Sequence, residues 1–140
     1  MKFYTVKLKY KNTYHNFEFE ISGDMYKKEN NEWVRLEAEL SDVDDDFILF
    51  FENFFTPYLR RVTYNDIVFS DEYELEIYSY ETDEDLLIVH KVTWLQPIKK
   101  DYIHIIRYSS GEYSSEYLEI EEGIKRLKEL GLKMTTDLGA

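Results

Sequence analysis

Apolar and polar residues alternate with a period of two through much of this sequence. From Tyr4 to Tyr10 every second residue is large and apolar, and segment 17–21 repeats the pattern with glutamates. Successive side chains of a β-strand point to opposite faces, so the alternation predicts strands with one buried and one solvated face. Strand-like composition extends the prediction to segments 32–40, 58–64, 67–69, 73–80, 86–95 and 102–108, with a loop over residues 22–31.

The stretch 41–55, SDVDDDFILFFENFF, places four aspartates before a run of phenylalanines. Asp42, Asp44 and Asp46 have the spacing of an EF-hand calcium loop, but the sixth position is Phe47 rather than glycine and the twelfth is Asn53 rather than glutamate. The residue for the sharp turn and the bidentate ligand are therefore both missing. The pattern predicts that these aspartates do not form a calcium site.

The same aspartates suit the start of a helix. A carboxylate there caps free N–H groups and complements the positive end of the helix dipole. Ser41 or Asp42 is the expected cap of a helix over about residues 42–56. At 100° per residue Phe51 and Phe54 share one face of this helix, so both are predicted to be buried.

The last part of the chain predicts a second helix, over about residues 117–130. Ile124 and Leu127 lie on its apolar stripe, and Gly131 stands where a left-handed residue ends a helix. Together the segments predict an α+β fold: an antiparallel or mixed sheet of about six to eight short strands with two helices packed on it. The length of 140 residues predicts a single domain, residues 1–140.

The charge of the chain is segregated. The net charge is −12, but residues 1–14 carry four lysines and no acid. Residues 15–59 contain twelve acids against three bases, and residues 62–90 contain nine acids and no base. Proteins bind nucleic acids and anionic membranes mainly through lysine and arginine, so direct binding to either is disfavoured.

The sequence lacks the signatures of most catalytic sites. There is no cysteine, and His15, His90 and His104 stand in no zinc or Ser-His-Asp motif. The five glycines form no phosphate-binding loop. A non-enzymatic protein without a cofactor is therefore expected, and His90 and His104 are expected to be structural neighbours across two strands. No signal peptide or membrane-spanning run is present, so a cytoplasmic protein is expected.

A metal-dependent enzyme is an alternative. Glu74, Glu76, Asp85 and Lys91 are the residues that would have to converge in a nuclease-like site. Alternating acids on a strand are more commonly its solvated face.

Acidic residues also recur two positions apart, and such pairs place two carboxylates on the same side of a strand. A regular row of this kind resembles a phosphate backbone. A tyrosine among carboxylates and hydroxyls, in segment 112–117, adds the mixture typical of a protein interface. The predicted partner-binding residues are Glu18, Glu20, Glu37, Glu39, Asp71, Glu72, Glu74, Glu76, Asp83, Glu84, Asp85 and Tyr113.

These features predict an acidic binding protein that inhibits a basic nucleic-acid-binding protein or nuclease by occupying its groove. The abundance of Tyr, Phe, Ile and Lys indicates an AT-rich genome, as in many bacteria and their phages. A phage-encoded inhibitor of a CRISPR or restriction enzyme is the functional class that fits. An immunity or adaptor protein that binds a basic partner without mimicking nucleic acid is the alternative. The sequence indicates no oligomeric state.

Overall fold

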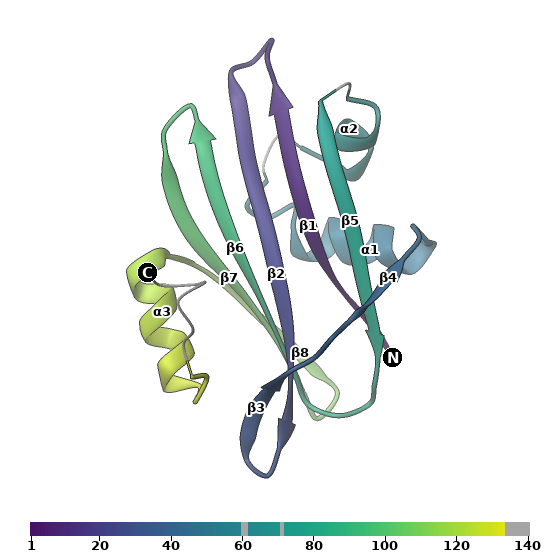
Figure 1. Ribbon diagram of the computed structural model, residues 1–140, viewed down its shortest axis with the longest axis vertical. Helices are drawn as coiled ribbons and strands as arrows, with labels where there is room; N and C mark the ends of the chain where they lie inside the picture. The colour runs from purple at the N-terminus through teal and green to yellow at the C-terminus, as the bar shows by residue number, and fades with distance from the viewer. Residues whose placement is uncertain (60–61, 71, 134–140) are drawn as a thin grey trace.

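The computed structural model describes residues 1–59, 62–70 and 72–133 of the chain (Figure 1). These residues form eight strands and three helices: β1 (Lys2–Asn12), β2 (Phe17–Glu29), β3 (Glu32–Arg35), β4 (Glu39–Ser41), α1 (Asp45–Phe54), α2 (Tyr64–Val68), β5 (Tyr73–Glu81), β6 (Leu86–Gln96), β7 (Lys100–Ser109), β8 (Glu112–Glu119) and α3 (Ile120–Glu129). Every strand pairing is antiparallel. The predicted α+β class is confirmed.

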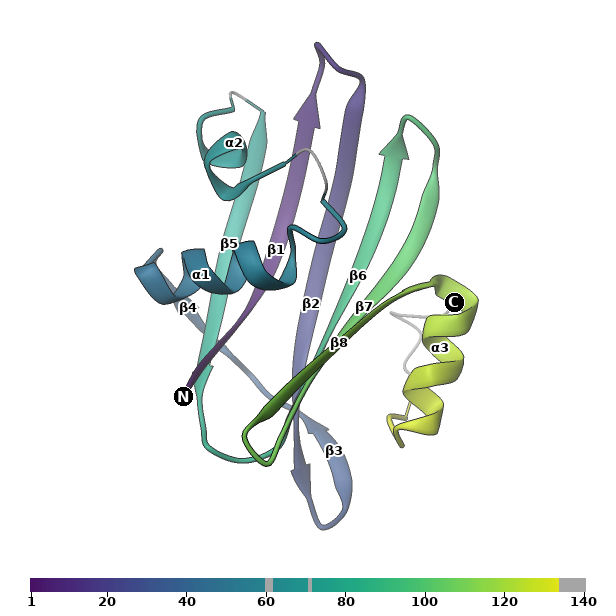
Figure 2. The ribbon, with the colours of Figure 1, turned by 180° about the vertical axis from the view of Figure 1, so that it is seen from behind.

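The strands form one sheet in the order β4-β5-β1-β2-β6-β7-β8, and β3 pairs with β2. Helices α1 and α2 lie against one face of β5, β1 and β2, as Figure 2 shows. Helix α3 packs on the other face, mainly against β7 and β8. Consecutive residues of β6 therefore enter different cores: Ile88 joins the cluster under α1, and Leu87 packs with Leu127 of α3. The strand predicted over residues 86–95 is confirmed, and it lies inside the sheet between β2 and β7.

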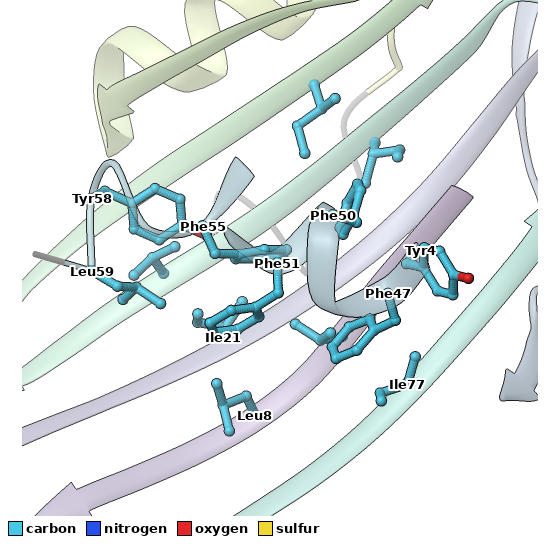
Figure 3. Close-up of a cluster of buried hydrophobic side chains, with 14 of the residues drawn as sticks. Tyr4, Leu8, Ile21, Phe47, Phe50, Phe51, Phe55, Tyr58, Leu59 and Ile77 are labelled. Carbon is cyan, nitrogen blue, oxygen red and sulfur yellow. The ribbon is translucent and has the colours of Figure 1, made fainter. Parts of the chain in front are cut away.

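The core under α1 is rich in aromatic side chains (Figure 3). Phe47, Phe51 and Phe55 are 0% exposed, whereas Leu49 on the opposite side of the helix is 61% exposed. The predicted face of the helix is thus confirmed for Phe51. Phe54 is only half-buried, and its ring packs against those of Phe50 and of Tyr113 on β8.

The cap and the end of this helix differ from the prediction. Asp44, not Ser41 or Asp42, is the N-cap, and its side chain accepts a hydrogen bond from the N–H of Phe47 at 2.7 Å. The helix ends at Phe54, two residues before the predicted end. The sequence did not identify the cap, because each of several neighbouring aspartates can accept such a bond.

The predicted loop over residues 22–31 is wrong, because β2 continues to Glu29. Met25 and Tyr26 are buried and pair with Ile88 and Leu87 of β6, so burial keeps this segment in the sheet. A glycine and polar residues suggested a turn, but tertiary packing overrides that tendency.

The single strand predicted over residues 32–40 is also wrong. It is divided into β3 and β4, and residues 36–38, here named the strap, cross the sheet on the side opposite α1 (Figure 1). The N–H of Leu36 bonds the carbonyl of Met25 at 2.8 Å, and β4 pairs with β5. The strap is therefore anchored at both ends. Val34 and Leu40, which a single alternating strand would place on one face, are 38% and 71% exposed.

The predicted strands at 58–64 and 67–69 are wrong as well. The described part of the first has no strand, and the second belongs to the short helix α2. Thr63 and Asp66 form a capping box, in which each side chain bonds the other's backbone N–H. The Thr-x-x-Asp spacing carried this helix signal, which hydrophobic periodicity over five residues does not reveal.

Helix α3 begins at Ile120 rather than near residue 117, because segment 112–119 is the strand β8. Its end is as predicted. Gly131 has a φ of 89°, and the N–H of Leu132 bonds the carbonyl of Leu127 at 3.0 Å, which closes a Schellman motif.

Candidate interaction surface

The face of β5, β1 and β2 opposite α1 and α2 carries alternating rows of charge. We name it the open face and define it by Glu74, Glu76, Lys7, Lys9, Lys11, Glu18 and Glu20. Lys9 stands directly opposite Glu74 on one side and Glu20 on the other. Opposite charges on neighbouring strands stabilise a sheet. The two predicted acid pairs of this face therefore lie on either side of a row of lysines.

A second concentration of acid surrounds the edge strand β4. A groove of about 670 Å³ lies there, which we name the β4 groove; its charged lining residues are Glu37, Glu39, Asp42, Asp44, Glu81 and Lys2. Five carboxylates thus face one ammonium group. They come from both acidic blocks of the sequence, because β4 pairs with β5. The fold creates this concentration, and no single segment contains it.

One carboxylate of the groove is engaged in the fold. Asp44 accepts hydrogen bonds from Lys2 Nζ at 2.8 Å and Tyr4 Oη at 2.6 Å, in addition to the N–H of Phe47. The bond from Lys2, followed by those from Tyr4 and Phe47, lowers the pKa of Asp44 to about 2, although partial burial opposes the shift. Asp44 therefore anchors α1 to β1, and Lys2 is committed to it.

The other four carboxylates of the groove form no ion pair within the part of the chain that the structure describes. The ion pairs of the described residues include none of Glu37, Glu39, Asp42 and Glu81. All four side chains are exposed. Such a site attracts a cationic group, and its field acts on a partner before contact.

Apolar side chains lie within the same groove. Leu40 is 71% exposed and Val43 is 42% exposed, and both line it. Along the described residues β4 pairs with β5 alone, so its outer side carries no strand. An apolar centre with a charged rim is the usual composition of a protein–protein contact.

The predicted acids Asp83, Glu84 and Asp85 lie in the β5–β6 hairpin, beside the start of β1. Asp83 pairs with the N-terminal ammonium group at 3.3 Å, and Asp85 accepts a weak bond from the N–H of Ser110 at 3.4 Å. Glu84 is exposed. Because Lys2 and Glu81 are cross-strand neighbours, this hairpin extends the acidic edge.

Tyr113 lies on β8 rather than in an interface loop. Its hydroxyl donates to Met1 Sδ at 3.1 Å, its ring packs against Phe3 and Phe54, and it is 40% exposed. Burial raises its pKa. Tyr117 packs inward, stacked on Tyr58 at 4.5 Å between ring centroids. Tyr113 is thus mainly a packing residue with one accessible edge.

Glu72 directly precedes the other end of β5. Glu72 accepts a bond from Thr13 Oγ1 at 3.1 Å, and Asp71 lies outside the described residues. The residues of the nuclease-like alternative do not converge, because β1 and β2 separate Glu74 and Glu76 from Lys91.

His90 and His104 are direct cross-strand neighbours, as predicted. Both are buried, and His90 Nε2 bonds Thr5 Oγ1 at 3.0 Å. Burial, and secondarily the neighbouring His104, lowers the pKa of His90 well below its usual range. Burial alone lowers the pKa of His104 to about 3. Both imidazole rings are neutral and lie in the core against Phe55.

Within residues 1–59, 62–70 and 72–133 no group of three or more histidines and carboxylates is placed to hold a metal ion. Over the same ranges, no helix has the length and apolar character needed to cross a membrane. Comparison of the chain with protein-family models, with curated proteins and with solved structures gives no match.

Proposed function

We propose that this protein is a non-enzymatic inhibitor that binds a basic partner through the β4 groove. One observation carries the proposal: acids from two separate blocks of sequence surround an exposed edge strand, and four of them form no ion pair among the described residues. The proposed partner is a nucleic-acid-binding protein or nuclease, whose basic groove the acidic edge occupies. Inhibitors of CRISPR or restriction nucleases encoded by phages are the class with this surface chemistry.

The physical basis is electrostatic steering followed by apolar contact. A chain with a net charge of −12 attracts a basic groove over roughly 8 Å at physiological salt, which speeds the encounter. Leu40 and Val43 then supply the apolar area that holds a complex together.

The open face favours a second candidate, an adaptor or immunity protein that binds a basic partner without mimicking nucleic acid. Mimicry of a phosphate backbone needs continuous rows of negative charge. On the open face Lys7, Lys9 and Lys11 interrupt them. The continuous acidic area is then limited to the edge of the sheet.

Competition separates the two candidates. The immobilised protein is used to capture a partner from a bacterial lysate, and duplex DNA or guide RNA is then added. A nucleic-acid mimic is displaced by the polyanion that it imitates, so release of the partner is the expected result. A partner that binds DNA and this protein together would overturn the inhibitor proposal in favour of the adaptor.

A further inference from the structure

A second cavity lies beneath the strap, on the opposite side of the sheet from α1. Strands β1 and β2 are paired only as far as Lys7 and Ser22. Beyond this point β2 pairs with β3, and the strap passes over the gap. The cavity has a volume of about 440 Å³, within the range of roughly 300 to 1,000 Å³ of small-molecule sites. We name it the strap pocket.

The wall of the strap pocket is anchored by a close contact at Gly23. A Cβ atom there would lie 2.0 Å from Thr5 Oγ1 and 2.4 Å from His90 Cδ2. Only glycine leaves room for the bond between these two buried side chains. The wall of the cavity is therefore fixed by the core, and only the strap above it is held by a few bonds.

The charges that line the strap pocket cancel. Lys7 and Arg35 are opposed by Asp24 and Glu37, in a chain that is otherwise strongly acidic. Asp24 already accepts bonds from Arg35 Nε at 3.1 Å and Nη2 at 2.9 Å. The ion pairs of the described residues include neither Lys7 nor Glu37. The Lys7 ammonium group on β1 and the Glu37 carboxylate on the strap thus form no ion pair among the described residues, although Glu76 is the cross-strand neighbour of Lys7.

The remaining lining adds apolar contact. Met25 is buried, and Leu36 and Ala38 of the strap are half-buried against the core. A simple anion is disfavoured by the net charge of the protein, and a simple cation meets more carboxylates in the β4 groove. A neutral molecule that carries both charges escapes both penalties.

We propose that the strap pocket binds a zwitterion with one apolar side chain, an α-amino acid or a dipeptide. Its carboxylate lies against Lys7, its ammonium group against Glu37, and its side chain against Leu36 and Ala38. The strap pocket shares Glu37 with the β4 groove, but Lys7 lines the strap pocket alone, so variants at Lys7 test this site independently of the proposed function.

The test is a calorimetric titration of the full-length chain with L-leucine and with glycyl-L-leucine. Saturable binding of either one is expected, and the tighter of the two identifies the source of the zwitterion. For leucine, N-acetyl-L-leucine lacks the ammonium group and L-leucinamide lacks the carboxylate. Each is expected to bind about tenfold more weakly, because a bond to a charged group is lost.

Two variants assign the contacts. Lys7→Met is expected to weaken leucine about tenfold and to leave leucinamide unchanged, and Glu37→Gln is expected to weaken leucine and leave N-acetyl-leucine unchanged. Lys9→Met and Glu39→Gln, their neighbours outside the strap pocket, are the matched controls. No saturable binding of either probe at millimolar concentration would overturn the proposal. Equal loss of binding in Lys9→Met would overturn it too.

Discussion

Strand β1 presents two faces to opposite surroundings. Tyr4 and Leu8 are each 1% exposed under α1, whereas Lys7 and Lys9 are exposed between two rows of glutamates. The same alternation in sequence therefore gives one face its packing and the other its charge. Burial of large side chains dominates stability, and exposed pairs contribute little. The charged face can accept changes that the buried face cannot.

The largest difference in stability between a buried and an exposed position is expected within α1. Phe51→Ala should lower the free energy of unfolding by about 3 to 5 kcal/mol, because it leaves a cavity among fixed aromatic rings. Leu49→Ala, on the exposed side of the same helix, should cost less than about 0.5 kcal/mol. Urea denaturation measures both. A loss below roughly 1 kcal/mol for Phe51→Ala would mean that α1 is not packed as described.

The buried histidines should make the packed side sensitive to acid. In the unfolded chain both titrate near pH 6.5, and in the folded chain their pKa values are lowered. Below pH 6.5 the unfolded state therefore binds protons that the folded state excludes. Stability should fall by up to about 1.4 kcal/mol per pH unit for each histidine, or about 2 kcal/mol each by pH 5.

The pH dependence is measured by urea denaturation between pH 7 and pH 5. His104→Leu should remove about half of the slope, and His15→Gln, at an exposed position, should leave it unchanged. Asp44 should not contribute in this window, because its folded-state pKa is lowered to about 2 and the unfolded chain takes up this proton only as the pH falls toward the ordinary pKa of 3.8. An unchanged slope in His104→Leu would contradict the assignment.

Asp44 lies where the charged surface meets the packed helix α1, and its substitution should have an intermediate effect on stability. Asp44→Ala removes the cap of α1 together with its bonds to Lys2 and Tyr4, so a loss of about 1 to 2 kcal/mol is expected. Asp45→Ala, one residue on and outside these bonds, should cost a few tenths of a kcal/mol at most. Thermal unfolding of the two variants compares them directly. Equal losses would show that Asp44 is not the cap.

The open face should respond least. Lys9→Glu places a like charge between Glu20 and Glu74, and a loss of up to about 1 kcal/mol is expected at low salt. High salt should reduce this loss by screening. The neutral variant Lys9→Gln should fall between the parent and Lys9→Glu. A loss independent of salt would indicate that Lys9 acts through packing rather than charge.

Local patterns predicted much of the buried side. The alternation in β1, the phenylalanine face of α1 and the stop at Gly131 each depend on residues close in sequence. The errors fall where distant segments decide the structure. The segment after Gly23 stays in the sheet because it pairs with β6. Strand β4 is separate from β3 because it pairs with β5.

The surface was harder to predict for the same reason. The acidic pairs were visible in the sequence, but their neighbours were not. The registers of β1 place lysines beside Glu20 and Glu74, and the pairing of β4 places Glu39 in one groove with Glu81. The four lysines and no acid of residues 1–14 were the one sequence signal for the lysines of the open face.

In the proposed function the β4 groove, rather than the open face, attracts a basic partner. The direct test of this attraction is the association rate of the captured partner, measured by surface plasmon resonance at low and high salt. Glu37→Lys with Glu39→Lys should slow association about tenfold or more at low salt, with a smaller difference at high salt. Glu74→Lys with Glu76→Lys should slow it less, because Lys7 and Lys9 already offset those acids.

Glu121→Lys with Glu122→Lys, on the exposed part of α3, provides the control and should change the rate least. Attraction by the β4 groove predicts this order of association rates for the three double variants at low salt, with smaller differences among them at high salt. Equal association rates for all three and for the parent, unaffected by salt, would contradict it.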